Sequence, residues 1–212
     1  IMPTFMARWN TDLPGCSGHI HQSLCDGSGK NIFQNDEDQH GMSSVFRSYL
    51  AGQMRCLPEI LPMLAPTVNS YKRLVEGFWA PTKVTWGVDN RTVALRVISG
   101  GASTRLETRV GGADMNGYLS IAACLAAGLY GIEEELELTD EPITGNGYEV
   151  EGAVRLPGSL KSAAEKMASS TIARRLFGDA FVDHFVGTRL WEAHQYAQSV
   201  TDWELKRYFE II

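Results

Sequence analysis

The chain has 212 residues, 44% of them hydrophobic, which is enough for one large domain, or a domain with a subdomain, around a sizeable core. Its 25 acidic and 19 basic residues give a formal net charge of −6, which argues against nonspecific binding to nucleic acid. Four cysteines without a CxxC pair, and no apolar run of about 18 residues, exclude a zinc module, a disulfide scaffold and a membrane span, and predict a soluble cytoplasmic protein.

The first residues predict two short strands. Residues 4–9 and 19–24 are rich in strand-forming side chains, and residues 10–18, which contain Gly, Pro and Asp, resemble a hairpin connection. Because residue 1 is Ile1 and a strand follows almost at once, we expect that a segment normally precedes this chain. The alternative is that Met2 is the true start.

Residues 43–64 predict an amphipathic helix, because apolar residues recur there at spacings of three and four. Ser43 or Ser44 is a suitable N-cap, since a hydroxyl at that position accepts a hydrogen bond from the first helical turn. Pro58 lacks the N–H that a helix interior needs and therefore predicts a break close to it.

Further strands and a second long helix are expected next. β-Branched residues and alternation predict antiparallel strands at 84–86, 92–97 and 105–110, with the glycine pair at 100–101 marking a turn between the last two. Residues 115–136 are rich in Ala and Gly and predict a helix that packs closely against the sheet.

A segment rich in Gly and Pro divides the chain. Residues 141–158 are predicted to be a loop between a catalytic body, 1–140, and a helical C-terminal subdomain, 159–212. Helices are expected in that subdomain at about 160–169, 172–177 and 179–198. The predicted fold class is α+β, an antiparallel sheet flanked by helices, with a functional site on the concave face of the sheet.

Two histidines point to the first candidate site. His19 and His21 flank Ile20 on a predicted strand, so both imidazoles face the same side, about 6 to 7 Å apart. One metal ligand and one phosphate contact could occupy such a pair. The alternative is two polar residues on a solvated strand face.

Charged residues alternate along the strand that contains Arg105, Glu107 and Arg109. A surface charge ladder is one interpretation. Arg91 and Arg96 precede it on a neighbouring predicted strand and create a positive excess that suits a polyphosphate and an acidic substrate. Glu107 among them is then better used to bind a Mg²⁺ that also contacts the phosphates.

The segment 69–77 is polar and basic, with Gly77 as a possible hinge and Phe78 and Trp79 following it. It could form a lid over a site. The alternative is a long surface connection with a hydrophobic plug.

The motifs taken together resemble the C-terminal catalytic domain of bacterial type-I glutamine synthetases. The matching runs are PGCSGHIHQSL, NSYKRLVEGFWAP, DNRTVALRV and RLETRVGGADMNGYL. The resemblance implies an ATP-dependent ligase that phosphorylates the γ-carboxylate of glutamate and passes the acyl group to ammonia or an amine, with Mg²⁺ or Mn²⁺. It also implies a homo-oligomer in which an N-terminal domain, absent from this chain, completes each site, so we expect the chain alone to be inactive and to expose apolar surface.

The resemblance also implies roles for individual residues. The metal ligands would be His19 and Glu107. The ATP contacts would be His21, Ser23, Arg96 and Arg105, and the residue that stabilises the transferring phosphoryl group would be Arg91. The substrate contacts would be Gly15, Arg73, Arg91 and Arg109.

Three departures from the family pattern are present, two at the substrate positions and one near the nucleotide contacts. Trp79 stands where the family's catalytic lid carries a glutamate, Pro14 replaces an asparagine, and residues 102–103 contain no counterpart of a lysine. The loss of the lid carboxylate favours an acceptor other than ammonia, such as methylamine or a putrescine-type polyamine, although glutamine synthesis stays open. The alternative of another class is a non-catalytic structural relative.

Overall fold

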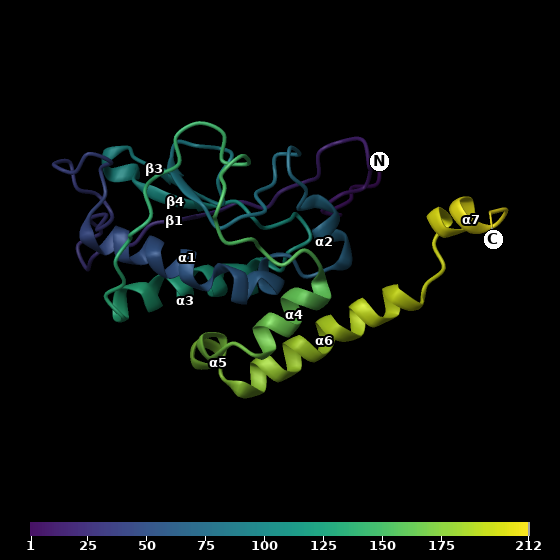
Figure 1. Cartoon of the computed structure of the whole chain (residues 1–212). Helices are drawn as coiled ribbons and strands as arrows, with labels where there is room; N and C mark the ends of the chain where they lie inside the picture. Colours follow the sequence, from purple (N-terminus) through teal and green to yellow (C-terminus); the bar gives the residue numbers. More distant parts are fainter. Residues whose placement is uncertain (212) are drawn as a thin grey trace.

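The computed structural model describes residues 1–211, and within that range four strands pair in the order β1-β4-β3-β2 (Figure 1). The strands are β1 (Ile20–Gln22), β2 (Trp86–Val88), β3 (Leu95–Ile98) and β4 (Arg105–Thr108), and the 3₁₀ turn η1 (Gly101–Ser103) joins the last two. β4 is antiparallel to both β1 and β3. The predicted α+β class is confirmed.

The prediction of a wholly antiparallel sheet is wrong at one pair, because β2 runs parallel to β3. The cause is the turn at Asp89, where a positive φ of 50° takes the chain out of the sheet. Residues 90–94 then return to the level of Trp86, which pairs with Leu95.

The predicted first strand, residues 4–9, is also wrong, since this segment contains no strand. Its backbone is satisfied elsewhere. The N–H of Arg8 donates to Asn69 Oδ1 at 2.8 Å, and Asn69 Nδ2 donates to the carbonyl oxygen of Arg8 at 2.8 Å. The segment is therefore fastened to the helix α2 (Val68–Arg73) rather than to the sheet.

Two helices cover one face of the sheet, α1 (Ser44–Leu64) and α3 (Gly117–Glu133) (Figure 1). Ser43 caps α1 as predicted, accepting a hydrogen bond from the N–H of Phe46 at 3.1 Å. The predicted break at Pro58 is wrong, because α1 continues through it to Leu64. Pro58 is buried in this helix, and its packing offsets the lost backbone hydrogen bond.

The helices α1 and α3 touch backbone to backbone. A Cβ built on Gly52 would lie 2.3 Å from the carbonyl oxygen of Ala127, and one built on Gly131 would lie 2.0 Å from that of Ser48. The Ala and Gly residues of α3, which were expected to pack closely against the sheet, pack chiefly against α1.

A buried polar network ties β4 to these helices. Thr108 Oγ1 donates to Gln53 Oε1 at 2.7 Å, and Gln53 Nε2 donates to Gln22 Oε1 at 2.8 Å and to the carbonyl oxygen of Cys124 at 3.0 Å. Because buried polar groups that lose their partners are costly, this network fixes the depth at which the sheet sits on α1 and α3.

The C-terminal helices are α4 (Leu160–Ala168), α5 (Thr171–Phe177), α6 (Asp179–Gln198) and α7 (Asp202–Tyr208). α4 packs against α1, and α7 lies away from the body at the end of an extended arm (Figure 1). Residues 141–158 contain no helix or strand. The division into a body and a subdomain stays a prediction, and none of the helices within residues 1–211 is long and apolar enough to cross a membrane.

The close contact of α1 with α3 at Gly52 and Gly131, called here the glycine seam, gives a first test. Gly52→Ala should lower the free energy of unfolding by about 1 to 3 kcal/mol, because the added methyl group meets the backbone of α3. Gly187→Ala is the matched control: it also lies inside a helix but has nothing within 4 Å of its built Cβ, so it should stabilise by about 0.5 to 1 kcal/mol. Urea unfolding of both variants measures the difference, and equal effects would contradict the seam.

Candidate functional site

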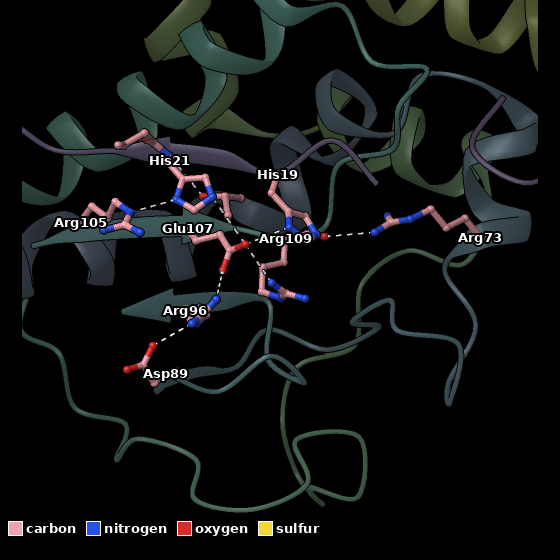
Figure 2. A network of polar contacts seen from close by, with 10 residues as sticks. His19, His21, Arg73, Asp89, Arg96, Arg105, Glu107 and Arg109 are labelled. Carbon is pink, nitrogen blue, oxygen red and sulfur yellow. Dashed lines mark hydrogen bonds and ion pairs between the residues drawn. The ribbon is translucent and has the colours of Figure 1, made fainter. Parts of the chain in front are cut away.

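The candidate site lies on the face of the sheet opposite α1 and α3 (Figures 1 and 2). Successive side chains of a strand point to opposite faces, so Ile20 and Leu106 enter the core while their neighbours point away from it. The strand register places His21 and Arg96 on either side of Glu107. Pairing of β1, β4 and β3 therefore gathers the charged residues of three separate motifs.

Glu107 is the centre of this cluster and is only 3% exposed. Its Oε1 atom lies 2.8 Å from His19 Nδ1 and 2.9 Å from Arg109 Nη1, and its Oε2 atom lies 3.2 Å from Arg96 Nη1 (Figure 2). Burial alone raises the pKa of Glu107, but Arg109, with His19 and Arg96, lowers it, and the net shift is downward. The residue is held as a carboxylate.

His19 is held as a neutral imidazole. Burial, together with the positive charge of Arg109, lowers the pKa of His19 from 6.5 to about 4, against the opposing effect of Glu107. The contact of Nδ1 with Glu107 places the ring proton on Nδ1 and the lone pair on Nε2. Nε2 is buried and has no hydrogen-bond partner among the described residues.

Two arginines, Arg96 and Arg105, connect the cluster to its surroundings. Arg96 Nη2 lies 2.8 Å from Asp89 Oδ1, so this guanidinium bridges Asp89 and Glu107. Arg105 Nε donates to His21 Nδ1 at 3.1 Å, and its Nη1 donates to the carbonyl oxygen of Ser103 at 3.0 Å. The structure thus brings together the two predicted metal ligands and three of the predicted ATP contacts.

Arg73 joins the site from α2 and is only 2% exposed. Its guanidinium donates to the carbonyl oxygens of Val110, at 3.0 Å, and Arg109, at 3.3 Å. Burial lowers the pKa of Arg73 to about 10, with Asp114 opposing the shift, so the side chain remains positively charged at neutral pH. A Cβ on Gly15 would lie 2.9 Å from Arg73 Cγ, which brings the predicted substrate contacts Gly15, Arg73 and Arg109 into one region.

Three predicted site residues lie outside the cluster. Ser23 is exposed just beyond β1. Arg91 is exposed and borders a separate hollow of about 440 Å³ with His40 and the loop that contains Pro142. Trp79 is 61% exposed and has a positive φ of 59°. Their predicted roles remain predictions.

The donor atoms suit part of a divalent-cation site. A neutral imidazole with an unshared, buried Nε2 is a typical metal ligand. Its other nitrogen contacts the Glu107 carboxylate, which orients the ring. Within residues 1–211, however, no group of three His, Cys, Asp or Glu residues could hold a metal. Any further ligands must come from phosphate, water or other parts of the full protein.

Two acidic residues at the site were not predicted. Asp89 holds Arg96, and Asp114 Oδ2 accepts hydrogen bonds from Ser70, at 2.6 Å, and Thr67, at 2.7 Å, at the start of α2. Asp114 therefore anchors the helix that ends with Arg73. Both acids occur inside the runs that carry the family resemblance, which is the signal that could have identified them.

Comparison with known proteins shows which family the chain resembles. The family model described as glutamine synthetase, catalytic domain, matches residues 1–208. Type-1 glutamine synthetase 2 of Dictyostelium discoideum is 56% identical, over 100% of this chain and 42% of its own length. Gamma-glutamylethanolamide synthetase GlnA4 of Streptomyces coelicolor is 48% identical, over 98% of this chain and 44% of its own length.

A solved GmaS/ADP complex has the same fold, with a TM-score of 0.86 and 31% sequence identity. The match covers 98% of this chain and 49% of that chain. The chain therefore spans somewhat less than half the length of the proteins that it resembles.

The buried neutral imidazole predicts a pH-dependent stability. The pKa of His19 is 6.5 in the unfolded chain and about 4 in the folded chain. Between these pH values the unfolded chain binds more protons, so the free energy of unfolding falls as pH falls. His19→Asn should reduce this slope, by at most about 1.4 kcal/mol per pH unit.

Urea unfolding between pH 4 and 7 in the presence of a chelator measures the slope, with His194→Asn on the exposed side of α6 as the control. The same slope in His19→Asn as in the unchanged protein would show that His19 is not held neutral.

Proposed function

The chain belongs to the glutamine synthetase family through its catalytic domain, and from that premise we propose that the full protein is an ATP-dependent ligase. It would join the γ-carboxylate of glutamate to ammonia or a primary amine through a γ-glutamyl phosphate. The observation that carries the proposal is the cluster on the open face of the sheet. There a buried carboxylate, Glu107, is held between Arg96 and Arg109, beside an unshared His19 nitrogen.

Charge complementarity supports the assignment of the nucleotide. Arg96 and Arg105 present guanidiniums along two adjacent strands, and guanidinium forks match phosphate oxygens in bidentate contacts. His21 lies on β1 and contacts Arg105, and Ser23 follows just beyond the end of that strand. ATP phosphates would occupy this edge of the cluster, and Arg91 would reach the transferring phosphoryl group from the neighbouring loop.

The opposite edge suits the amino-acid substrate. Arg73 is rigid, since two main-chain carbonyl oxygens fix its guanidinium, and the absence of a side chain on Gly15 keeps the backbone close to it. We propose that Arg73 and Arg109 hold the glutamate carboxylates and that the backbone of Gly15 meets the amino group. Rigid donors reduce the entropic cost of fixing the substrate beside the phosphates.

We also propose Mg²⁺ or Mn²⁺ as the cation, held by His19 and Glu107 together with ligands outside this chain. When bound, such a cation screens phosphate charge and polarises the phosphoryl oxygens. Arg96 and Arg109 hold the Glu107 carboxylate in place beside His19. Residues 1–211 supply too few ligands for the cation, so we propose that other parts of the full protein supply the rest. We also propose that the full protein is a cytoplasmic homo-oligomer.

Trp79 supports an amine acceptor. It follows a tethered segment, in which Glu76 contacts Arg155 at 3.2 Å and Phe78 lies beneath the Arg8 guanidinium at 4.5 Å. The indole is exposed and available to line a site completed by the rest of the protein. An aromatic face binds an alkylammonium better than a small, strongly hydrated ammonium ion, because it also covers the alkyl group.

An acceptor assay tests the reaction. The full-length protein, with ATP, Mg²⁺ and glutamate, should release phosphate faster with methylamine or putrescine than with ammonia, and should form the matching γ-glutamyl amide. Preference for ammonia would overturn the assignment of the acceptor. No turnover with any acceptor would instead favour a non-catalytic structural relative.

The lid residue can be tested separately. Trp79→Glu should shift the ratio of kcat/KM values towards ammonia over methylamine by about tenfold, the equivalent of about 1.4 kcal/mol. Trp191→Glu is the matched control, since Trp191 is 62% exposed on α6 and lies outside the cluster. Equal ratios in the two variants would show that Trp79 does not contact the acceptor.

A further inference from the structure

A second cavity lies beside the sheet edge, away from the Glu107 cluster. Its volume is about 860 Å³, within the range of small-molecule sites. One wall is the side of α1 that contains Met54 and Pro58, a second is the edge strand around Trp86, and the third is formed by residues 136–143 and 150–154. None of the residues assigned above to ATP, metal or glutamate lines it.

Hydrogen bonds to main-chain carbonyl oxygens hold the walls of the cavity in place. The N–H of Ile143 donates to the carbonyl oxygen of Trp86 at 2.8 Å, and the N–H of Val84 donates to that of Val154 at 2.8 Å. The indole N–H of Trp86 donates to the carbonyl oxygen of Asp140 at 2.9 Å. One stretch is therefore fastened to β2 at Trp86 and the other to Val84, just before that strand, so the cavity is already formed.

The lining combines an apolar floor with an acidic rim. Trp86, Val84 and Met54 are among the apolar residues of the floor. The acidic lining residues within the described part of the chain are Glu59, Glu137, Asp140, Glu141 and Glu151, and the basic ones are Arg55 and Lys166. Arg55 is already neutralised by Glu59, at 2.7 Å. The charge that remains available to a ligand is thus negative.

We propose that this cavity binds a protonated primary alkylamine, with the alkyl chain on the apolar floor and the ammonium group at Glu141 and Glu151. The apolar floor suits an alkyl chain, and the acidic rim suits a positive charge. An anion would meet uncompensated carboxylates, and a neutral alkane would leave them without a partner. The site is separate from the acceptor position proposed above and does not depend on it.

Equilibrium dialysis of the full-length protein with radiolabelled hexylamine at pH 7 tests the proposal. Hexylamine should bind, and hexanol should compete at least about fivefold more weakly, since it lacks the charge that two rim carboxylates attract. The double change Glu141→Gln, Glu151→Gln should weaken binding by about fivefold as well. Ala153→Phe should weaken it as well, because the added ring occupies part of the cavity.

Glu133→Gln is the matched control, because Glu133 is an exposed acid at the end of α3 that does not line the cavity. It should bind hexylamine as the unchanged protein does. The proposal is overturned if hexylamine does not bind at millimolar concentration, or if hexanol competes equally well. It is also overturned if neither the double variant nor Ala153→Phe weakens binding, which would place the amine at another site.

Discussion

The buried carboxylate of Glu107 is the constraint on which the site depends. A charge with so little exposure requires compensation, and Arg109, Arg96 and His19 provide it from three strands or their ends. The compensation works only while β1, β4 and β3 keep their register, because a shift by one residue would turn each side chain to the other face. The strand register therefore determines both the fold and the compensation of the Glu107 charge.

The strand register in turn depends on contacts at the face of the sheet that α1 and α3 cover. Thr108, the neighbour of Glu107, points into the network of Gln53 and Gln22, and α3 can approach only because Gly52 and Gly131 lack side chains. Polar bonds therefore specify the depth of the sheet and glycine contacts specify the helix spacing. The positions of the charged residues on the opposite face therefore depend on both the polar bonds and the glycine contacts.

Much of this could be predicted from patterns that are local. Alternation at residues 19–21 and 105–109 correctly placed the histidines and Glu107 on shared faces, and the cap at Ser43 followed from its hydroxyl. The parallel pairing of β2 could not be predicted, since it results from the backbone turn at Asp89. Nor could the partner of residues 4–9, because Asn69 is sixty-one residues from Arg8 and no local signal links them. Sequence patterns thus identify the residues of a strand face better than the loops that decide which strand lies beside it.

The loop at residues 141–158 has a consequence that reaches beyond packing. It walls the second cavity and also holds Asn90, whose side chain donates to the carbonyl oxygens of Ile143, at 3.0 Å, and Gly145, at 2.9 Å. Asn90 is the immediate neighbour of Arg91. The loop therefore joins the two hollows, because Ile143 lines both of them and its carbonyl oxygen also holds the residue next to Arg91.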